Sequence, residues 1–502
     1  MLLSKYNLKN VDKAHVIVPD DKIFGLPEKV LQFGTGVLLR GLPDYMIDKA
    51  NRQGIFKGRI VVVKSTDTGD SSAFEKQDCL YTISSRGLEN GINIEENIIC
   101  SAISRVLSAK HEWTSILECA HNPQMQVIIS NTTERGIELV NDDIRKHPPV
   151  SFPGKLLAFL FERYKAFAGS AQSGMVIVPT ELIPENGRKL ESIVLELAHL
   201  NALDVKFIEW LENNNHFCNS LVDRIVPGKP DNLTRKHIQE SIGYIDELIT
   251  VAEVYRLWAI EGDNAISQIL SFHCIDKGVI IAPDINLFRE LKLRLLNGTH
   301  ILASGVAFLS GINTVNEAME DQTICSFISE LMLNEISLAI PYPVTPIDAE
   351  IFANQVIERF GNPLIHHPWL NITMNYSVKL QLRVIPILLR YYEVFQSVPE
   401  NMATSFAAFI LFVKVTRQDQ SVYYGECNGK EYVIYDENAP YYFLTWKSNT
   451  PEEVVSIILE DFQIWGTDLT LLPGFATEVT NKLVLMIKHG VMHAVQSKKV
   501  LA

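Results

Sequence analysis

Four apolar segments in the first half of the chain constrain the fold more than any other feature. They lie at about 29–33, 59–64, 124–134 and 174–183, and helical patterns separate them, the first of which extends to about residue 54. Strands that are apolar along their whole length need cover on both faces, and intervening helices make successive strands parallel. The pattern therefore predicts a doubly wound α/β domain.

From about residue 284 onward the sequence has the periodicity of helices. Segments such as VNEAMEDQTICSFISELMLNEI and FATEVTNKLVLMIKHGVMHAVQ place apolar residues at helical spacing between polar, Pro and Gly breaks. One exception, SVYYGECNGKEYVIYDEN, alternates aromatic residues around Asn428-Gly429, which is the pattern of a β-hairpin. We therefore expect two domains, a parallel-sheet domain over residues 1–283 and a mostly helical domain over residues 284–502.

Composition and charge narrow the range of partners. Of the 502 residues, 47% are hydrophobic and 21% are charged, which is typical of a folded globular protein. The formal net charge of −14 argues against a nucleic acid or an anionic membrane as the partner, because both need a basic surface. An anionic small molecule would therefore have to be bound locally, by a few arginines or lysines in a pocket.

Cysteine usage and the N-terminal sequence indicate the compartment. The seven cysteines are scattered and never form a CxxC pair, so we expect a reducing compartment and neither a disulfide framework nor a zinc site. The sequence MLLSKYNLKNVDKAH lacks the apolar stretch of a signal peptide, and no run approaches the length of a membrane span. We therefore expect a cytoplasmic protein.

The segment QFGTGVLLR places two glycines directly after the first predicted strand. Glycine at 36 would let the backbone approach a pyrophosphate, and the free N–H groups of the helix start, from Val37 onward, would point at its charge. The third glycine of the usual fingerprint is missing, since Leu39 occupies its place. The alternative is a plain tight strand-to-helix connection. The position at the start of a parallel sheet favours a Rossmann-like dinucleotide site.

We expect the residues of this turn, together with polar residues that follow neighbouring strands, to bind the cofactor. These are Phe33, Gly34, Thr35, Gly36, Val37, Arg40, Asp67, Asn131 and Thr132. Asp67 is the nearest acidic residue to the end of the second strand, where a carboxylate would bind the adenosine ribose. Lys64 lies closer to the strand end, so this stretch leaves the choice between NAD and its phosphorylated form open.

The segment KLRLLNGTH contains the most specific polar pattern of the second half. On an α-helix, Lys292, Asn297 and His300 fall within one arc of about 140° and can face one cavity. The same arc holds Leu293 and Leu296, so the amine would lie in an apolar wall. Burial there would lower the pKa of the lysine and make it a general base. Alternatively, the lysine extends to solvent, the histidine is a core residue and the asparagine caps a turn.

Several separated motifs together resemble the long-chain polyol dehydrogenase family, of which mannitol dehydrogenase is a member. The motifs are Lys-x4-Asn-x2-His at 292–300, GxGxxxR at 34–40 and NSLVDRI at 219–225, and the resemblance covers essentially the whole chain. Within the family, SNTTERGI (130–137), ELIPENG (181–187) and RFGNP (359–363) are most similar to members that act on sugar acids. Polyol-acting members carry an asparagine where this chain has Leu182, which also favours a sugar acid over a neutral sugar alcohol.

The resemblance implies a metal-independent, NAD-dependent oxidoreductase that interconverts a keto and a hydroxy sugar acid. Lys292 would transfer the proton, Asn297 would donate to the developing alkoxide, and His300 would bind a neighbouring hydroxyl or hold the lysine. Asp223 would order substrate hydroxyls or tune the lysine. Its alternative role is a surface ion pair with Arg224.

The substrate carboxylate of a sugar acid needs a cation. Arg383 is the first candidate because its guanidinium can bind a carboxylate through two hydrogen bonds, and Lys379 lies on the same predicted helix face. The alternative for both is a solvated helix face.

Other readings of the sequence stay open. His489 and His493 have i, i+4 spacing but no evident third ligand, so we expect a structural role and no metal site. Three functions remain, namely a sugar-acid oxidoreductase, a relative acting on another hexuronate or on mannitol, and a non-catalytic dinucleotide-binding sensor. The sequence does not specify the oligomeric state.

Overall fold

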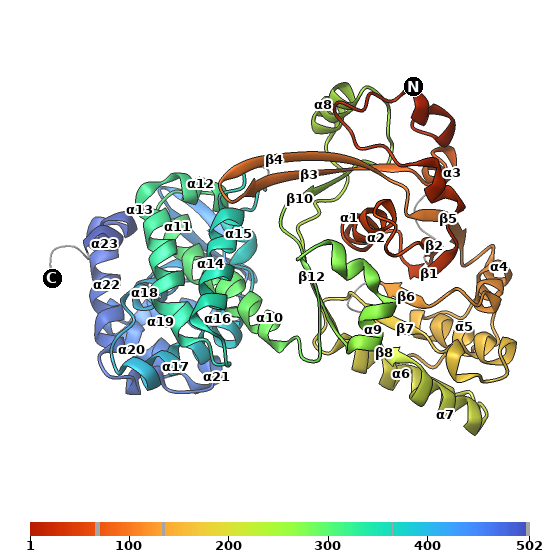
Figure 1. Ribbon diagram of the computed structural model, residues 1–502. Helices are drawn as coiled ribbons and strands as arrows, with labels where there is room; N and C mark the ends of the chain where they lie inside the picture. Colours follow the sequence, from red (N-terminus) through yellow and green to blue (C-terminus); the bar gives the residue numbers. More distant parts are fainter. Residues whose placement is uncertain (66–70, 133–135, 364, 498–502) are drawn as a thin grey trace. The chain divides into compact units, whose positions relative to one another are not determined.

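The computed structural model describes residues 1–65, 71–132, 136–363 and 365–497. The chain forms two compact units, Met1–Ile285 and Asn286–Ala502 (Figure 1). No helix in the described residues is both long and apolar enough to cross a membrane.

A six-stranded parallel sheet forms the centre of the first unit. Its order is β5-β2-β1-β6-β7-β8, and every neighbouring pair is parallel. The strands are β1 (Glu28–Phe33), β2 (Arg59–Lys64), β5 (Ile103–Ser108), β6 (Val127–Ser130), β7 (Val176–Pro179) and β8 (His216–Phe217). The chain builds outward from β1 to β5 and then returns to the other side of β1, so the strand order reverses between β1 and β6. Such switch points are where open α/β sheets bind ligands.

Helices cover both faces of this sheet, which confirms the predicted doubly wound architecture. Leu31 and Phe33 of β1 pack into one core with the helices of one face, whereas Val30 packs into a second core on the other face. The helices of the first face are α4 (Trp113–Glu118), α5 (Phe152–Ala166), α6 (Asn186–Leu200) and α7 (Val205–Asn214), as Figure 1 shows. Successive side chains of such a strand point to opposite faces of the sheet, so one apolar strand contributes residues to both hydrophobic cores.

The helical stretch that the sequence predicts after β1, to about residue 54, is present and consists of two helices. It consists of α1 (Val37–Gly41) and α2 (Pro43–Arg52), with the non-helical Leu42 between them. Proline has no N–H for a helical hydrogen bond, and its ring would clash with the carbonyl four residues earlier in a helix. Proline is therefore common at the start of a helix and rare within one. The stretch is therefore divided at Pro43, and its second helix ends close to the predicted limit.

The described residues of the first unit also form two smaller sheets and further helices. Strands β3 (Tyr81–Glu89) and β4 (Ile92–Cys100) form a long antiparallel hairpin, closed by Asn90 and Gly91 at φ +53° and +73°. Strand β10 (Thr250–Glu253) pairs with β3, and β12 (Val279–Ala282), β11 (Leu257–Glu261) and β9 (Ser220–Asp223) form the other sheet. The α-helices among them are α3 (Ser72–Lys76), α8 (Asn232–Ile242) and α9 (Asn264–Ile269).

The second unit is mostly helical, as predicted. Its central helix α18 (Glu400–Phe412) is buried along most of its length and packs against α11 (Thr299–Leu309) and α22 (Phe475–His489). The other α-helices are α10 (Asn286–Leu291), α12 (Val315–Glu320), α13 (Gln322–Glu330), α14 (Pro346–Phe360), α15 (Trp369–Ile372), α16 (Tyr376–Arg383), α17 (Ile385–Phe395), α19 (Ala439–Ser448), α20 (Pro451–Glu460), α21 (Phe462–Trp465) and α23 (Val491–Gln496). Two segments, η7 (Lys292–Gly298) and η8 (Leu331–Ile336), are π-helices.

The one predicted hairpin of this unit is present. Strands β14 (Val422–Cys427) and β15 (Lys430–Val433) pair antiparallel, and β13 (Arg417–Asp419) adds a third strand. Asn428 and Gly429 close the turn with φ values of +52° and +74°. A two-residue turn with two positive φ values matches the twist of the strands that it joins.

Candidate functional site

The turn at the carboxyl end of β1 requires a glycine at its first position. Gly34 has φ +127°, and its N–H donates to the carbonyl of Val63 at 3.0 Å. A Cβ atom at this position would lie 2.9 Å from Leu39 Cδ1 and 3.0 Å from the carbonyl oxygen of Asn131. Only a residue without a side chain fits this conformation between two neighbouring segments.

Gly36 has a different environment from that of Gly34. Its φ of −63° is open to any residue, and a Cβ atom built on it would meet no protein atom within 4 Å. The fold itself therefore does not require glycine at this position. Helix α1 begins at the next residue, and the first amides of a helix have no partner within it. This open backbone fits a phosphate group that approaches the turn closely.

The other residues of the turn differ in how they can contribute. Phe33 is buried and its ring packs against Phe152 with a centroid distance of 5.1 Å, so only its backbone is available. Thr35 and Val37 flank Gly36 and are half-buried.

The side chain of Arg40 contacts the protein on several sides. Its Nη1 donates to the carbonyl of Leu248 at 2.6 Å. The guanidinium also lies over the rings of Phe74 and Tyr81, at 5.9 and 5.6 Å. Burial lowers the pKa of this arginine, and the nearby Tyr81 acts in the opposite direction. Arg40 thus anchors α1 to the segment that precedes β10.

Asn131 lies on the β6 side of the switch point. Its N–H donates to the carbonyl of Phe33 at 3.2 Å, and its side-chain amide donates to the carbonyl and hydroxyl of Thr180 at 3.1 and 3.0 Å. The ends of β1, β6 and β7 are therefore tied together beside the glycine turn. Asp67, the predicted ribose ligand, lies outside the described residues.

A buried carboxyl group that the sequence analysis did not select supports the neighbouring loop. Glu181 accepts hydrogen bonds from the N–H and hydroxyl of Thr132 at 2.8 and 3.0 Å, and from the hydroxyl of Ser130 at 3.1 Å. Burial raises the pKa of Glu181, and these donors oppose the shift. The sequence feature that could have marked Glu181 is its position two residues after the end of the apolar strand β7.

Leu182, which stands in the place of the asparagine of polyol-acting members, is 63% exposed. The loop around it is held by Asn186, whose side-chain amide donates to the carbonyls of Pro179, Glu181 and Ser220 at 3.0 to 3.1 Å. The ELIPENG stretch is therefore a loop that leads into α6, and its exposed position carries an apolar side chain.

Asp223 and Arg224 do not form an exposed pair, because both side chains are buried. Arg224 Nε donates to the carbonyl of Glu253 at 2.9 Å, and its Nη1 donates to the carbonyl of Gly41 at the end of α1. Its guanidinium lies 4.6 Å from the ring centroid of Tyr45, and burial lowers the pKa of this arginine to about 10. The surface alternative was therefore wrong, and Arg224 ties α1 to the end of β9.

In the second unit, the residues from Lys292 to Gly298 form a π-helix and not the expected α-helix. Hydrogen bonds in a π-helix connect residues five apart, so each turn contains more residues than an α-helical turn. Lys292 and Asn297, which are five residues apart, come closer to alignment than the α-helical spacing predicts. Both side chains are half-buried, whereas Leu296 is buried. Short π-helical segments of this kind occur frequently at functional sites.

The buried Arg294 fixes the position of this π-helix. Its Nε donates to Glu290 at 2.9 Å, and its Nη1 donates to the carbonyls of Leu382 and Arg383 at 3.0 and 2.8 Å. Those carbonyls lie at the C-terminal end of α16, the helix that carries Lys379. The structure therefore brings the predicted proton-transfer segment and the predicted carboxylate-binding helix together.

His300 is the second residue of α11 and lies in an aromatic cluster. Its ring stacks on Phe360 with a centroid distance of 4.2 Å and an interplanar angle of 7°. The rings of His367 and Trp369 stand edge-on to it, at 5.3 and 6.2 Å. Burial lowers the pKa of His367, and the positive charge of Lys379 lowers it further. No sequence motif connects His367 with residue 300, so its place beside that ring was not predicted.

Neither predicted carboxylate ligand lies on a fully solvated face. Lys379 and Arg383 are both half-buried, and the Nζ of Lys379 donates to the carbonyl of Ile372 at 2.8 Å. Burial lowers the pKa of each group, and the charge of Arg383 further lowers the pKa of Lys379. The two cations thus lie close enough to repel each other, which an anion bound between them would relieve.

His489 and His493 are exposed, with their ring centroids 5.2 Å apart. In the part of the chain that the structure describes, no group of three or more His, Cys, Asp or Glu side chains is arranged to hold a metal ion.

Two sequence models of known domains match this chain. The mannitol dehydrogenase Rossmann domain matches residues 28–272, and the mannitol dehydrogenase C-terminal domain matches residues 284–487. The altronate oxidoreductase of Halalkalibacterium halodurans is 35% identical over 480 residues, which covers 94% of this chain and 93% of the relative. That of Cronobacter sakazakii is 36% identical over 478 residues, covering 93% and 96%.

Solved structures show the same fold over the whole chain. Mannitol 2-dehydrogenase from Pseudomonas fluorescens, in a ternary complex with NAD and D-mannitol, is 20% identical with a TM-score of 0.67 and 99% coverage of both chains. A D-sorbitol dehydrogenase in substrate-free form is also 20% identical, with a TM-score of 0.79 and coverage of 99% of this chain and all of that one.

Proposed function

The chain belongs to the mannitol dehydrogenase family of oxidoreductases acting on CH–OH groups, and we propose that it is an NAD-dependent enzyme that interconverts D-tagaturonate and D-altronate. The curated relatives are named altronate oxidoreductases, which supports altronate as the hydroxy acid of this pair. The observation that carries the proposal is the π-helix, which presents Lys292 and Asn297 and is tied to the helix of Arg383.

The turn of the first unit supplies the cofactor site in this proposal. The backbone from Gly34 to Val37 would hold the pyrophosphate, because a Cβ at Gly36 would enter otherwise open space. Asn131 and Thr132 line the other side of the switch point, held by Thr180 and Glu181. NAD would supply or accept the hydride.

The reduction also needs one proton at the oxygen of the ketone. Lys292 donates this proton and, in the oxidative direction, removes it from the hydroxyl of altronate. Asn297 donates its side-chain N–H to the oxygen on which negative charge develops. The stacked ring of His300 is held by Phe360 and can bind a neighbouring substrate hydroxyl. All three residues lie on the π-helix and the start of α11, which follow each other directly, so their relative positions are fixed by one helical segment.

The carboxylate of the substrate distinguishes a sugar acid from a sugar alcohol. Arg383 can bind it through two parallel hydrogen bonds, and Lys379 adds a second positive charge on the same helix. Two half-buried cations without an anion repel each other, so the pair favours a negatively charged substrate over a neutral one.

The test is oxidation of NADH measured side by side with tagaturonate, fructuronate and fructose. We expect the highest kcat/KM with tagaturonate and the lowest with fructose. Preference for fructose would contradict a sugar-acid substrate, and preference for fructuronate would identify a different hexuronate. NADH binding without turnover of any of the three would support a sensor and contradict the proposal.

A further inference from the structure

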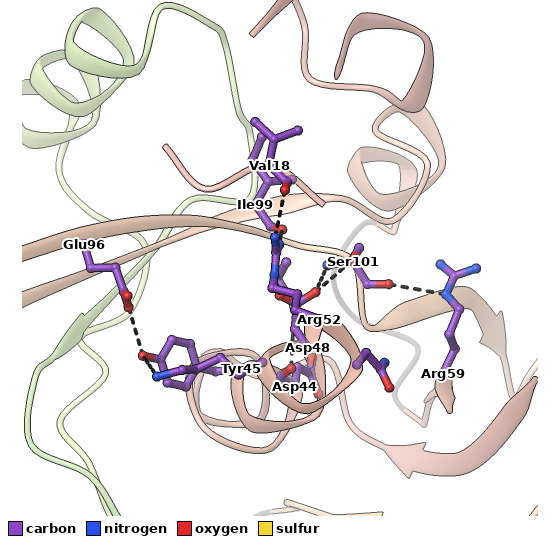
Figure 2. A network of polar contacts seen from close by, with 12 residues as sticks. Val18, Asp44, Tyr45, Asp48, Arg52, Arg59, Glu96, Ile99 and Ser101 are labelled. Carbon is purple, nitrogen blue, oxygen red and sulfur yellow. Dashed lines mark hydrogen bonds and ion pairs between the residues drawn. The ribbon is translucent and has the colours of Figure 1, made fainter. Parts of the chain in front are cut away.

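Helix α2 carries two buried carboxyl groups one turn apart. Asp48 has both oxygens paired: Oδ2 accepts from Arg52 Nε at 2.6 Å, and Oδ1 accepts from the N–H and hydroxyl of Ser101, each at 2.7 Å (Figure 2). Arg52 also donates to the carbonyls of Val18 and Ile99. Asp48 is therefore a structural carboxylate with a complete set of donors.

Asp44 is equally inaccessible to solvent but is only half paired. Its Oδ2 accepts from the hydroxyl of Tyr81 at 2.8 Å, whereas its Oδ1 has no hydrogen-bond partner among the described residues. The charged and titratable groups around it are Arg40 of α1, Asp48 of α2, Tyr81 of β3 and Cys100 of β4. Burial raises the pKa of Asp44 to about 7, against the opposing effects of Tyr81 and Arg40.

Gln32 of β1 connects this carboxyl group with the glycine turn. The side chain is fully buried, and its amide lies near enough to Asp44 to lower the pKa of that carboxyl group, against the larger effect of burial. Its Nε2 also lies 3.5 Å from the carbonyl oxygen of Gly34, while its Oε1 has no partner in the described part of the chain. The amide thus lies between a carboxyl group and the carbonyl of the turn.

One proton could pair both of the unpaired oxygens, Asp44 Oδ1 and Gln32 Oε1. A proton on Asp44 Oδ1 would donate to Gln32 Oε1, which satisfies both buried atoms and directs the amide N–H toward the Gly34 carbonyl. Without that proton, the amide N–H of Gln32 would donate to the carboxylate of Asp44 and would no longer donate to the carbonyl of Gly34. The ionised carboxylate would also place negative charge behind a turn that binds an anion.

We propose that Asp44 and Gln32 are positioning residues for the dinucleotide turn, and that the protonated form of Asp44 holds the turn in its binding conformation. This inference rests on the proposed function, because it takes the turn at Gly34 as the cofactor site. It predicts that the affinity for NADH falls as pH rises through neutrality.

The test is the Kd of NADH, measured by fluorescence titration over about two pH units on either side of neutrality. We expect the Kd of the wild type to rise about five- to tenfold across this range, a typical coupling between two sites. Asp44→Asn keeps a donor toward Gln32, so its Kd should stay near the low-pH value at every pH. Tyr81→Phe removes a donor to the ionised form, so its midpoint should move to higher pH.

Tyr45→Phe is the matched control. Tyr45 follows Asp44 on α2, and its hydroxyl donates to Glu96 at 3.0 Å (Figure 2) and not to Asp44 or Gln32, so the pH profile of this variant should match that of the wild type. If Asp44→Asn keeps the wild-type pH dependence, or Tyr81→Phe leaves the midpoint in place, the inference is overturned. If Asp44→Asn does not fold, the midpoint of the pH dependence in Tyr81→Phe is sufficient to test the inference. NADH binding that is independent of pH contradicts only this inference, whereas no binding at any pH contradicts the proposed function as well.

Discussion

Arg294 donates a hydrogen bond to the backbone carbonyl of Arg383 at 2.8 Å. The contact uses the main chain of residue 383 and leaves its guanidinium available. It joins two segments with different proposed tasks, since the π-helix carries the proton donor and α16 carries the cations for the carboxylate. The buried Arg294 therefore holds the π-helix against the end of α16, although we propose no role for Arg294 in proton transfer or in carboxylate binding.

Replacing Arg383 with methionine should affect the binding of a sugar acid selectively. We expect the KM for tagaturonate to rise about 10- to 100-fold, the usual loss when charge-assisted hydrogen bonds are removed. The Kd of NADH should not change, and neither should the weak activity toward fructose, which has no carboxylate. Steady-state kinetics with both substrates measures the effect. Arg390→Met on the exposed face of α17 is the control, and equal losses for both substrates would contradict carboxylate binding by Arg383.

Replacing Lys292 with methionine should remove the proton donor while keeping most of the side-chain volume. We expect kcat to fall by about 10²- to 10⁴-fold, the usual contribution of a positioned acid or base, with little change in the Kd of NADH. Single-turnover kinetics and NADH titration separate the two quantities. Lys488→Met in α22 controls for the loss of one lysine. Near-normal turnover of the Lys292 variant would identify the lysine as a packing residue.

The two glycines of the turn should respond differently to substitution. Gly36→Val adds a side chain in open space at an ordinary φ, so the thermal midpoint should stay close to that of the wild type while NADH binding is lost. Gly34→Ala forces a Cβ to 2.9 Å from Leu39 at φ +127° and should lower the free energy of unfolding by about 1–3 kcal/mol. Thermal unfolding and NADH titration of both variants give the comparison. Unchanged NADH affinity in Gly36→Val would remove the cofactor assignment.

The sheet was predictable because its signal is local and strong. Runs such as RIVVVK are apolar on both faces, and the observed β2 spans the predicted range Arg59–Lys64. The hairpin around Asn428-Gly429 was predicted from its turn residues. The longer hairpin around Asn90-Gly91 was missed, although it carries the same dipeptide, because its flanking strands contain several polar residues at positions that point to solvent.

The candidate site was less predictable, because much of it depends on contacts between distant segments. The π-helical form of residues 292–298 adds a residue to a turn, and a 100° spacing rule cannot detect it. The burial of Arg224 depends on carbonyls that lie 29 and 183 positions away in the chain. Pairing of Glu181 with Thr132 likewise crosses from β7 to β6. Such partners become visible only when the strands are placed side by side.

Asp44→Asn should also change how stability depends on pH. The folded-state pKa of Asp44 is about 7, above its ordinary value near 4, so the folded protein holds this proton more tightly than the unfolded chain does. The contribution of Asp44 is therefore fully present below about pH 4 and is lost as pH rises to about 7, by up to about 1.4 kcal/mol per pH unit. Because asparagine does not titrate, the variant should gain stability relative to the wild type across this window, with a constant difference above it. Urea unfolding of both proteins at a series of pH values measures this difference. A difference that is independent of pH would show that Asp44 titrates alike in the folded and unfolded protein and would contradict a proton held behind the turn.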